Sequence, residues 1–235
     1  MPKSAQNQAS RVVKPADERQ SEILDVAQRL FWEKGYDRTP ISAIIKAIGI
    51  AKGTFYHHYT SKQDLLDAIA RRLSDRALQI AMPALHDPNL SAPEKFRAIF
   101  GGIGAWKLDN KQMFLSLLRP IYAEENVALR MRLNQVSLRM FAPVVTRVIE
   151  QGMEEGAFTC TDADVVVRMM FTLATDLGEL IARSLLDPDK GVGMDELARQ
   201  IDAYNDGINR LLGAEPGTIE LFALDAIRPW FKEDA

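Results

Sequence analysis

The sequence predicts an all-α fold with a small basic N-terminal part and a larger acidic helical body. Apolar residues recur every three or four positions from about Ala16 onward, and no stretch sustains the alternation of a β-strand. Residues 1–72 hold 12 Lys and Arg against 8 Asp and Glu, a net charge of +4, while the remainder holds 17 against 24. A chain of 235 residues can form one large domain or two modest ones, and this charge asymmetry favours two.

The chain should begin with an arm followed by two helices. Residues 1–15 are polar, carry basic but no acidic side chains and lack periodicity, so we expect a flexible basic arm. A first helix extends from about Ala16 to Gly35, where the glycine closes it. Thr39-Pro40 supplies a capping side chain and a proline in the first turn, which predicts a second helix that ends at Gly49.

Two more helices complete the N-terminal domain, which we place at 16–77. A third, short helix is expected at about 51–58. The motif Ser61-x-x-Asp64 is a capping box that opens a fourth helix, continuing through Leu73.

The C-terminal domain, 78–235, should contain only helices after a proline-rich turn at 81–96. The run Val-Val-Val at 165–167 lies within a helical repeat, so helix is the better interpretation. Pro120 should end one helix, and Pro143 should kink or split another. The candidate helices are 92–106, 109–122, 124–153, 162–186, 193–213 and 216–232.

Several classes of function find no support in the sequence. The single cysteine, Cys160, excludes an intramolecular disulfide framework, and His57 and His58 are adjacent, so they point apart on a helix and cannot share one metal ion. No nucleophile, zinc or phosphate-loop motif is present. We therefore predict no enzyme, cofactor or metal. With no apolar stretch long enough to span a bilayer and no secretory signal, we expect a cytoplasmic protein without a membrane partner.

The stretch GIAKGTFYHHYTSKQDLL (49–66) concentrates the unusual residues. Phe55 and Tyr59 are four positions apart, so both should face a small core. The outward side chains would then be Lys52, Thr54, Tyr56 and His57, beside Gly53, with His58 at the edge. Lysine, hydroxyl and imidazole groups suit phosphates and base edges, and two short helices around a glycine turn form a helix-turn-helix. The plainer alternatives are solvated lysines, a Tyr56 packed in the core and a His58 at the core edge.

At this point the sequence resembles the TetR/AcrR family of transcriptional regulators over residues 18–66. The matching features are F-W-E-K-G-Y (31–36), Thr39, A-I-G-I-A-K-G-T-F-Y-H-H-Y (47–59) and S-K-Q-D-L-L (61–66). The resemblance implies a DNA-binding domain followed by a ligand-binding and dimerisation domain. Where the family often has Ser or Thr this chain has Ala51, which removes a helix cap worth about 1 kcal/mol and a possible phosphate contact.

The resemblance also assigns roles to single residues. Thr39 would meet a phosphate in addition to capping its helix. The front of the third helix would approach base edges, and the remaining side chains would hold the DNA backbone. The implied DNA-binding residues are Thr39, Lys52, Gly53, Thr54, Tyr56, His57, His58 and Lys62.

The last two long helices carry apolar stripes that suit helix packing. The resemblance places a homodimer interface there, although internal core is the alternative for any single position. The implied interface residues are Val166, Met170, Leu173, Leu177, Leu180, Met194, Leu197, Ile201, Tyr204, Ile208 and Leu211.

A pocket for an unidentified small-molecule effector should lie within helices spanning roughly 92–180. Aromatic and methionine side chains fit such a pocket, although they also fit an ordinary core. The candidate liners are Trp106, Met113, Phe114, Leu117, Tyr122, Met140, Phe141, Met169, Phe171 and Asp176.

The combined prediction is a ligand-responsive regulator, a repressor in the first instance, that binds a palindromic double-stranded operator as a homodimer. An all-helical enzyme and a helical binding or scaffold protein without DNA binding are the alternatives.

Overall fold

The computed structural model describes residues 15–187, 189 and 191–231, and apart from Pro15 the predicted basic arm lies outside them. The described residues contain no β-strand, so the predicted all-α fold is confirmed. The main helices are α1 (Ala16–Lys34), α2 (Ile41–Ile48), α3 (Lys52–His58), α4 (Lys62–His86), α5 (Ala92–Asp109), α6 (Lys111–Ile121), α7 (Val127–Glu154), α8 (Ala163–Leu186), α9 (Met194–Leu212) and α10 (Leu224–Ile227).

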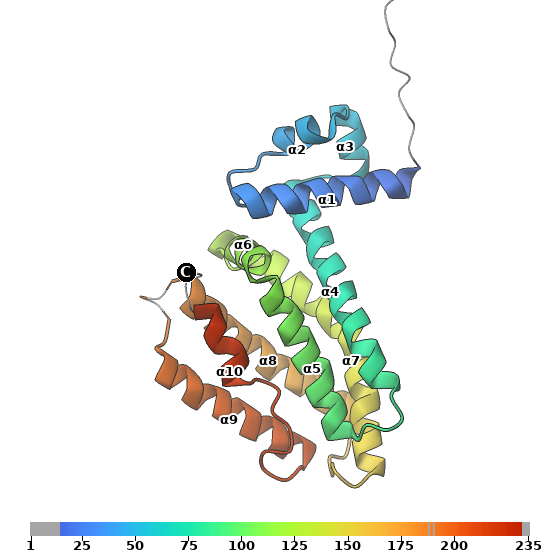
Figure 1. The fold of residues 1–235 in the computed structure, drawn as a ribbon, viewed down its shortest axis with the longest axis vertical. Helices are drawn as coiled ribbons and strands as arrows, with labels where there is room; N and C mark the ends of the chain where they lie inside the picture. Colours follow the sequence, from blue (N-terminus) through green and yellow to red (C-terminus); the bar gives the residue numbers. More distant parts are fainter. Residues whose placement is uncertain (1–14, 188, 190, 232–235) are drawn as a thin grey trace, which may run out of the picture.

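Helices α1–α3 form a small unit at one end of the molecule, and α4 leads from it into the larger helical body (Figure 1). The core of this unit brings together Phe31 of α1, Ile44 of α2 and Phe55 of α3, each with none of its surface exposed. Met113 and Leu117 of α6 belong to the same apolar cluster. The small unit therefore rests directly on the body through α6 as well as through α4.

Helix α4 is longer than the sequence indicated, because it continues through Pro83 to His86. The predicted turn at 81–96 is correct only for residues 87–91. Proline removes one backbone hydrogen bond, but Ala81 and Leu85 are buried against the body and tertiary packing keeps the helix intact. As a result one continuous helix joins the two parts of the chain.

In the body, α5 and α7 pack against the second half of α4, and α8 packs between α7 and α9 (Figure 1). Pro120 stands one residue before the end of α6, as predicted. Pro143, in contrast, does not split α7, which is a single helix over Val127–Glu154. Pro143 is exposed, so water can bond the carbonyl of Arg139 that it leaves without a partner, while Val144 and Val145 hold the helix to the core.

The predicted helix at 216–232 is wrong for most of its length. Only the short α10 and a 3-10 turn at Arg228–Phe231 form, and residue 232 lies outside the described part. The reason is that side-chain amides of α9 take the backbone groups that a helix would use. Asn209 bonds both the N–H and the carbonyl of Ile219 at 2.8 Å, and Asn205 bonds the N–H of Leu221 at 3.0 Å.

Candidate nucleic-acid interface and internal cavity

The turn between α2 and α3 has the geometry of a helix-turn-helix. Gly49 adopts the left-handed conformation (φ 76°, ψ 30°), which favours glycine and ends α2 in one residue. Behind the turn, Phe55 and Tyr59 are buried, with 0% and 2% of their surface exposed. The inward face of α3 is therefore as predicted, and the remaining side chains must point outward.

The outward face of α3 is polar, basic and open. Lys52, Gly53, Tyr56 and His57 are exposed, and a Cβ added at Gly53 would meet nothing within 4 Å. Tyr56 exposes 42% of its surface, and Lys52 holds its Nζ 5.8 Å from the centre of the Tyr56 ring. Thr54 is half-buried on the same short helix.

His58 lies at the edge of this face, half-buried, as the sequence suggested. Burial lowers the pKa of its imidazole, and the charges of His57 and Arg19 lower it further. His58 is therefore predominantly neutral at pH 7 in the free protein.

Lys62, at the start of α4, is positioned by aromatic rings. Its Nζ lies 4.0 Å from the centre of the Tyr36 ring and 5.9 Å from that of Phe31. Burial lowers the pKa of this ammonium group, while the carboxylate of Asp37 acts in the opposite direction. Lys62 remains partly accessible, so its charge can face a phosphate without leaving the rings.

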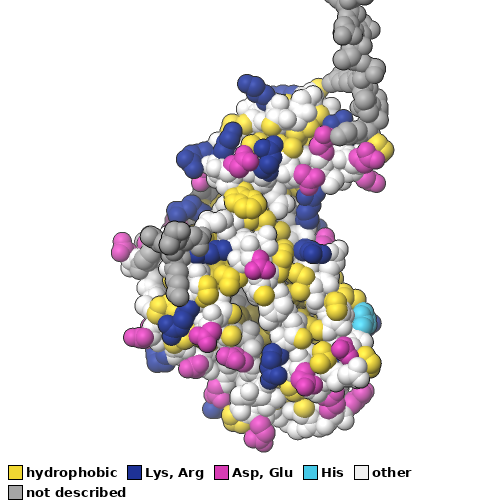
Figure 2. All heavy atoms as spheres, in the orientation of Figure 1, with side chains coloured by type: hydrophobic (Ala, Val, Ile, Leu, Met, Phe, Trp, Pro, Cys, Tyr) yellow, Lys and Arg dark blue, Asp and Glu magenta, His cyan; other side chains and the backbone are white. Residues whose placement is uncertain are grey.

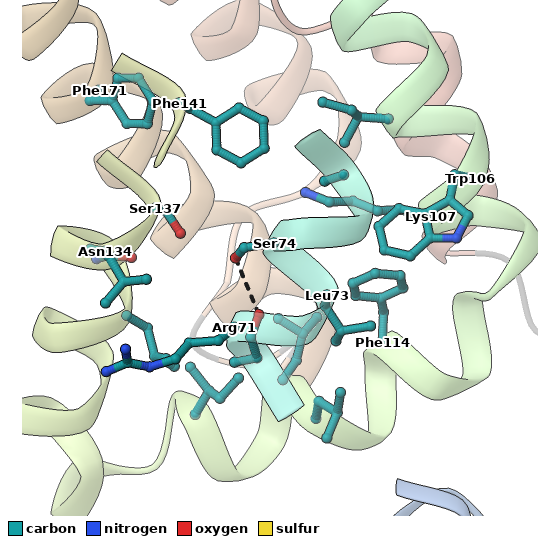
Figure 3. Close-up of a pocket in the computed structure, with 18 of the residues that line it drawn as sticks. Arg71, Leu73, Ser74, Trp106, Lys107, Phe114, Asn134, Ser137, Phe141 and Phe171 are labelled. Atoms are coloured by element: carbon teal, nitrogen blue, oxygen red, sulfur yellow. Dashed lines mark hydrogen bonds between the residues drawn. The ribbon is translucent and has the colours of Figure 1, made fainter. Parts of the chain in front are cut away.

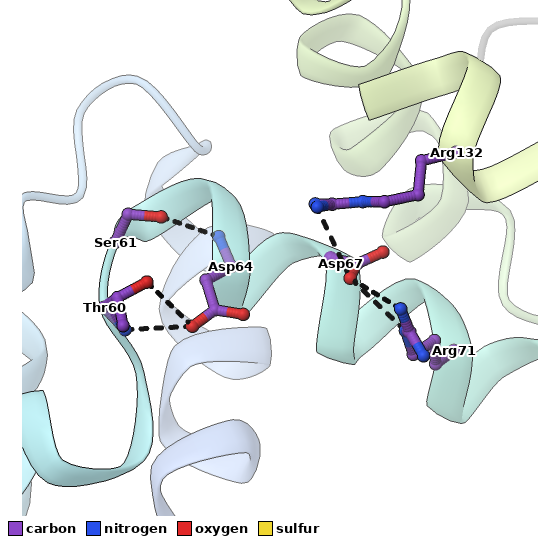
Figure 4. A network of polar contacts seen from close by, with 6 residues as sticks. All are labelled: Thr60, Ser61, Asp64, Asp67, Arg71 and Arg132. Atoms are coloured by element: carbon purple, nitrogen blue, oxygen red, sulfur yellow. Dashed lines mark hydrogen bonds and ion pairs between the residues drawn. The ribbon is translucent and has the colours of Figure 1, made fainter. Parts of the chain in front are cut away.

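Ser61 and Asp64 form the predicted cap of α4, with one difference (Figure 4). The Ser61 hydroxyl accepts the N–H of Asp64 at 2.9 Å. The Asp64 carboxylate, however, accepts the N–H of Thr60 at 2.9 Å rather than that of Ser61. The cap therefore fixes residue 60, between α3 and α4.

Thr39 does not have the role that the sequence suggested. Its side chain is completely buried, and its hydroxyl lies 2.8 Å from the carbonyl of Gly35 and 3.2 Å from that of Leu30, where it donates. Pro40, not Thr39, occupies the N-cap position of α2, which has no side-chain cap. Thr39 joins the end of α1 to the start of α2 and is not available to a phosphate.

The N-terminal unit and the helical body differ in their balance of basic and acidic side chains. On the face shown in Figure 2, Lys and Arg side chains stand around the small N-terminal unit together with several Asp and Glu, and Asp and Glu are also frequent over the lower helices of the body. The described residues 15–72 hold nine Lys and Arg against eight Asp and Glu, because Lys3, Arg11 and Lys14 lie outside the described part of the chain. Residues 73–235 hold 17 Lys and Arg against 24 Asp and Glu, so a polyanion would be repelled by the body and would approach the α3 end more easily.

A cavity of about 360 Å³, partly open to solvent, lies in the body and is lined by α4, α5, α6, α7 and α8. Six of the predicted liners belong to it: Trp106, Phe114, Leu117, Tyr122, Phe141 and Phe171. Trp106 and Phe114 meet edge to face, with ring centres 5.2 Å apart. Figure 3 shows aromatic side chains on opposite sides of the hollow, with Ser74 and Ser137 between them.

Four predicted liners lie elsewhere. Met113 is buried in the core of the N-terminal unit, where its sulfur accepts the side-chain N–H of Gln28. Met140 is half-buried outside the lining, and Met169 exposes 46% of its surface on α8. Asp176 is exposed and accepts a hydrogen bond from the hydroxyl of Tyr204.

The cavity also contains polar residues that the sequence reasoning missed: Arg71, Ser74, Lys107, Asn134 and Ser137. Lys107 had a detectable signal, because it follows Phe100 by seven positions and Ile103 by four on the apolar side of its helix. The core-facing stripe of a helix normally carries apolar residues, so a lysine at such a position indicates a site that differs from ordinary core.

A carboxylate on α4 links the two parts of the chain. Asp67 exposes 5% of its surface and bonds Arg71 on the next turn of α4, at 3.1 Å. It also pairs with Arg132 of α7 at 3.5 Å (Figure 4). Because Arg71 also lines the cavity, this cluster lies between the cavity and the N-terminal unit.

The predicted interface residues of α8 and α9 divide into two groups. Val166, Met170, Leu177, Leu197, Ile201 and Ile208 are buried within their own chain, so they are core residues and not contacts to a partner. Leu173, Leu180, Met194, Tyr204 and Leu211 are half-buried and retain some accessible surface. The apolar stripes of α8 and α9 are each wide enough to pack against the chain's own core on one side and against a partner on the other. Helical periodicity alone did not indicate which residues belong to which side.

In the part of the chain that the structure describes, no helix is both long and apolar enough to cross a membrane. The same residues contain no cluster of three or more His, Cys, Asp or Glu side chains that could hold a metal ion.

The helix-turn-helix with its basic outward face defines a DNA-binding regulatory protein, and comparison with known proteins shows which family it is similar to. Residues 23–69 match the model described as bacterial regulatory proteins, tetR family. The chain is 34% identical over 82 residues to the HTH-type transcriptional repressor Rv1474c of Mycobacterium tuberculosis, a match that covers 33% of this chain and 44% of that protein. It is 26% identical over 196 residues to the repressor KstR2 of Rhodococcus jostii, covering 79% of this chain and 91% of KstR2.

A solved structure agrees with these matches. The TetR/AcrR-family transcriptional regulator from Thermobifida fusca has 26% sequence identity and a TM-score of 0.53, covering 83% of this chain and 96% of that one. Over residues 23–69 this protein therefore matches the tetR family of bacterial regulatory proteins, and over most of its length it is similar to a repressor and to a solved regulator of that kind. These relatives are regulators and not enzymes, so the enzyme alternative is set aside.

Proposed function

We propose that this protein is a cytoplasmic, ligand-responsive transcriptional repressor that binds a palindromic operator as a homodimer. The observation that carries the proposal is the outward face of α3, with Lys52, Tyr56 and His57 exposed on a helix whose other face is anchored by Phe55. Repression, rather than activation, is favoured by the description of Rv1474c and KstR2 as repressors.

A homodimer is what sequence-specific reading requires, because one helix of seven residues can contact few base pairs. Two copies related by a twofold axis would read successive major-groove turns, about 34–36 Å apart or a multiple of that distance. The half-buried apolar residues on α8 and α9, together with the exposed Met169, offer a surface for the second copy.

The route from effector to DNA passes along α4. One end of this helix carries Lys62 beside α3, and its middle, at Ser74 and Ala77, lines the cavity. An effector that prefers a conformation in which α4 is displaced would change the separation of the two α3 helices. Such a ligand weakens operator binding by its differential affinity for the two conformations, commonly about 1–3 kcal/mol.

The proposal is tested by selecting bound sequences from a random pool of duplex DNA. We expect an inverted repeat, with affinity that falls steeply as salt rises because lysines and arginines displace counterions from phosphates. Lys62→Ala should reduce the slope of log affinity against log salt by about 1.8, since each of two protomers loses one phosphate contact worth about 0.9. Tyr56→Ala should weaken binding with a smaller change in slope.

Arg97→Ala is the matched control, because Arg97 is an exposed cation on α5, which the proposal places neither at the DNA nor at the dimer surface. It should leave both affinity and salt slope unchanged. Selection that yields no common sequence, or Lys62→Ala and Tyr56→Ala variants that bind like the unaltered protein, would contradict the proposal.

A further inference from the structure

Lys107 is placed where a charged side chain is unexpected. It projects from α5 into the cavity, and Figure 3 shows its amino end between Ser74 and Phe141 in that view. Lys107 is exposed, so a molecule from solution can reach it. The surrounding protein nevertheless displaces enough water that burial lowers the pKa of its ammonium group.

No protein group balances this charge within the described residues. The cavity lining contains no aspartate or glutamate, and no hydrogen bond or ion pair joins the ammonium group of Lys107 to the described part of the chain. Arg71, the other cation of the lining, is already bonded to Asp67. The cavity therefore presents a positive charge beside aromatic rings that no acidic side chain of the lining balances, and an anion bound there would balance it.

The rest of the lining specifies the body of such an anion. Trp106, Phe114, Phe141 and Phe171 give the cavity apolar walls, and a hollow of about 360 Å³ is within the range that holds a small organic molecule. The wall formed by α4 and α7 contributes Ser74, Asn134 and Ser137. The Ser74 hydroxyl donates to the carbonyl of Ala70 at 3.2 Å, and its rotation toward the cavity would let it donate to a carboxylate instead.

We propose that the effector is a small organic acid with an apolar, aromatic or aliphatic body, and that Lys107 binds its carboxylate. This inference rests on the proposed function, because it identifies the chemical class of the molecule that releases the repressor. Lys107 lies on α5, and Ser74 and Ala77 of α4 line the same cavity. An acid held by Lys107 would therefore contact α4, and its binding would depend on the position of that helix.

The test compares acids with their uncharged counterparts in the absence of DNA. Calorimetric titration would use benzoate, biphenylcarboxylate and decanoate, each beside its primary amide, which has the same shape but no charge. For the unaltered protein at pH 7, we expect at least one acid to bind about 10- to 100-fold more tightly than its amide, as expected for a charge-assisted hydrogen bond.

Three variants locate the effect. Lys107→Met keeps the length of the side chain and removes its charge, so the preference for the acid should disappear. Lys107→Arg keeps the charge and should retain the preference. Arg97→Met removes an exposed cation from the same helix outside the cavity and should behave like the unaltered protein. Circular dichroism checks that each variant is folded.

Equal binding of acid and amide to the unaltered protein, absence of binding by all three acids, or undiminished acid preference in Lys107→Met would overturn this inference. Operator binding is measured separately on the same samples. A protein that binds its operator but does not prefer acids refutes the acid site alone, whereas one that prefers acids but binds no operator refutes the proposed function.

Discussion

Replacing Thr39 by valine separates a structural role from a DNA contact at one position. Valine has nearly the same shape, so the substitution removes the hydroxyl that lies 2.8 Å from the carbonyl of Gly35 and leaves the packing volume almost unchanged. The site has no exposed surface, so water cannot replace the lost donor at the side chain. We expect the free energy of unfolding to fall by about 1–2 kcal/mol, the cost of one neutral hydrogen bond and an incompletely satisfied acceptor.

The assay is urea unfolding followed by circular dichroism, combined with operator titrations at several salt concentrations. Thr39→Val should lower the midpoint of unfolding while the salt slope of DNA binding stays the same. Thr39→Ser, which keeps the hydroxyl, should lose less stability than Thr39→Val. The reasoning is refuted if Thr39→Val is as stable as the unaltered protein and its salt slope falls by about 1.8, because that result describes a phosphate contact in each of two protomers.

Three further outcomes follow from the structure. Ala51→Ser should raise the free energy of unfolding by about 1 kcal/mol in a thermal melt, since Ala51 is the N-cap of α3 and has no side-chain acceptor; an unchanged melt would argue against this cap. The folded protein binds fewer protons at His58 than the unfolded chain, so stability should decline as pH falls below the ordinary value of 6.5, and His58→Gln should reduce that decline in denaturation curves measured across this range. As the pH is raised, Lys107 should lose its proton, and with it the preference for acids over amides, before the pH reaches the ordinary lysine pKa of 10.5. Calorimetry that shows a constant preference up to pH 10.5 would count against a lowered pKa.

Sequence reasoning predicted the N-terminal unit well, because local chemistry determines it. Gly49 ends α2 through a conformation that favours glycine, Ser61 caps α4 through its own side chain, and Phe55 and Tyr59 share a face through helical spacing. Each of these signals lies within a few residues of the feature that it specifies.

The predicted helix boundaries are wrong where contacts between residues far apart in the sequence determine the structure. Pro83 and Pro143 usually end or bend a helix, but buried neighbours packed on other helices hold α4 and α7 continuous. The segment after α9 is not helical because Asn205 and Asn209 bind its backbone. The pair Pro216-Gly217, which is typical of a turn, was the signal within the segment that the sequence prediction did not use.

The candidate site shows the same limit. Its outward residues on α3 followed from periodicity, but periodicity could not show that Thr39 is enclosed between α1 and α2. Likewise, the apolar stripes of α8 and α9 predicted packing without indicating whether the partner is the same chain. Lys107 broke a stripe on α5, and only the arrangement of five helices around it shows that the stripe faces a hollow.

The central claim is that two outward-facing α3 helices read one operator as a symmetric pair. A hydroxyl-radical footprint on the selected operator tests this most directly. We expect two protected regions related by a twofold axis, with centres one helical turn of about 10–10.5 base pairs apart or a multiple of it, and loss of both in Tyr56→Ala. A single protected region, or a symmetric footprint that Tyr56→Ala leaves intact, would contradict the account.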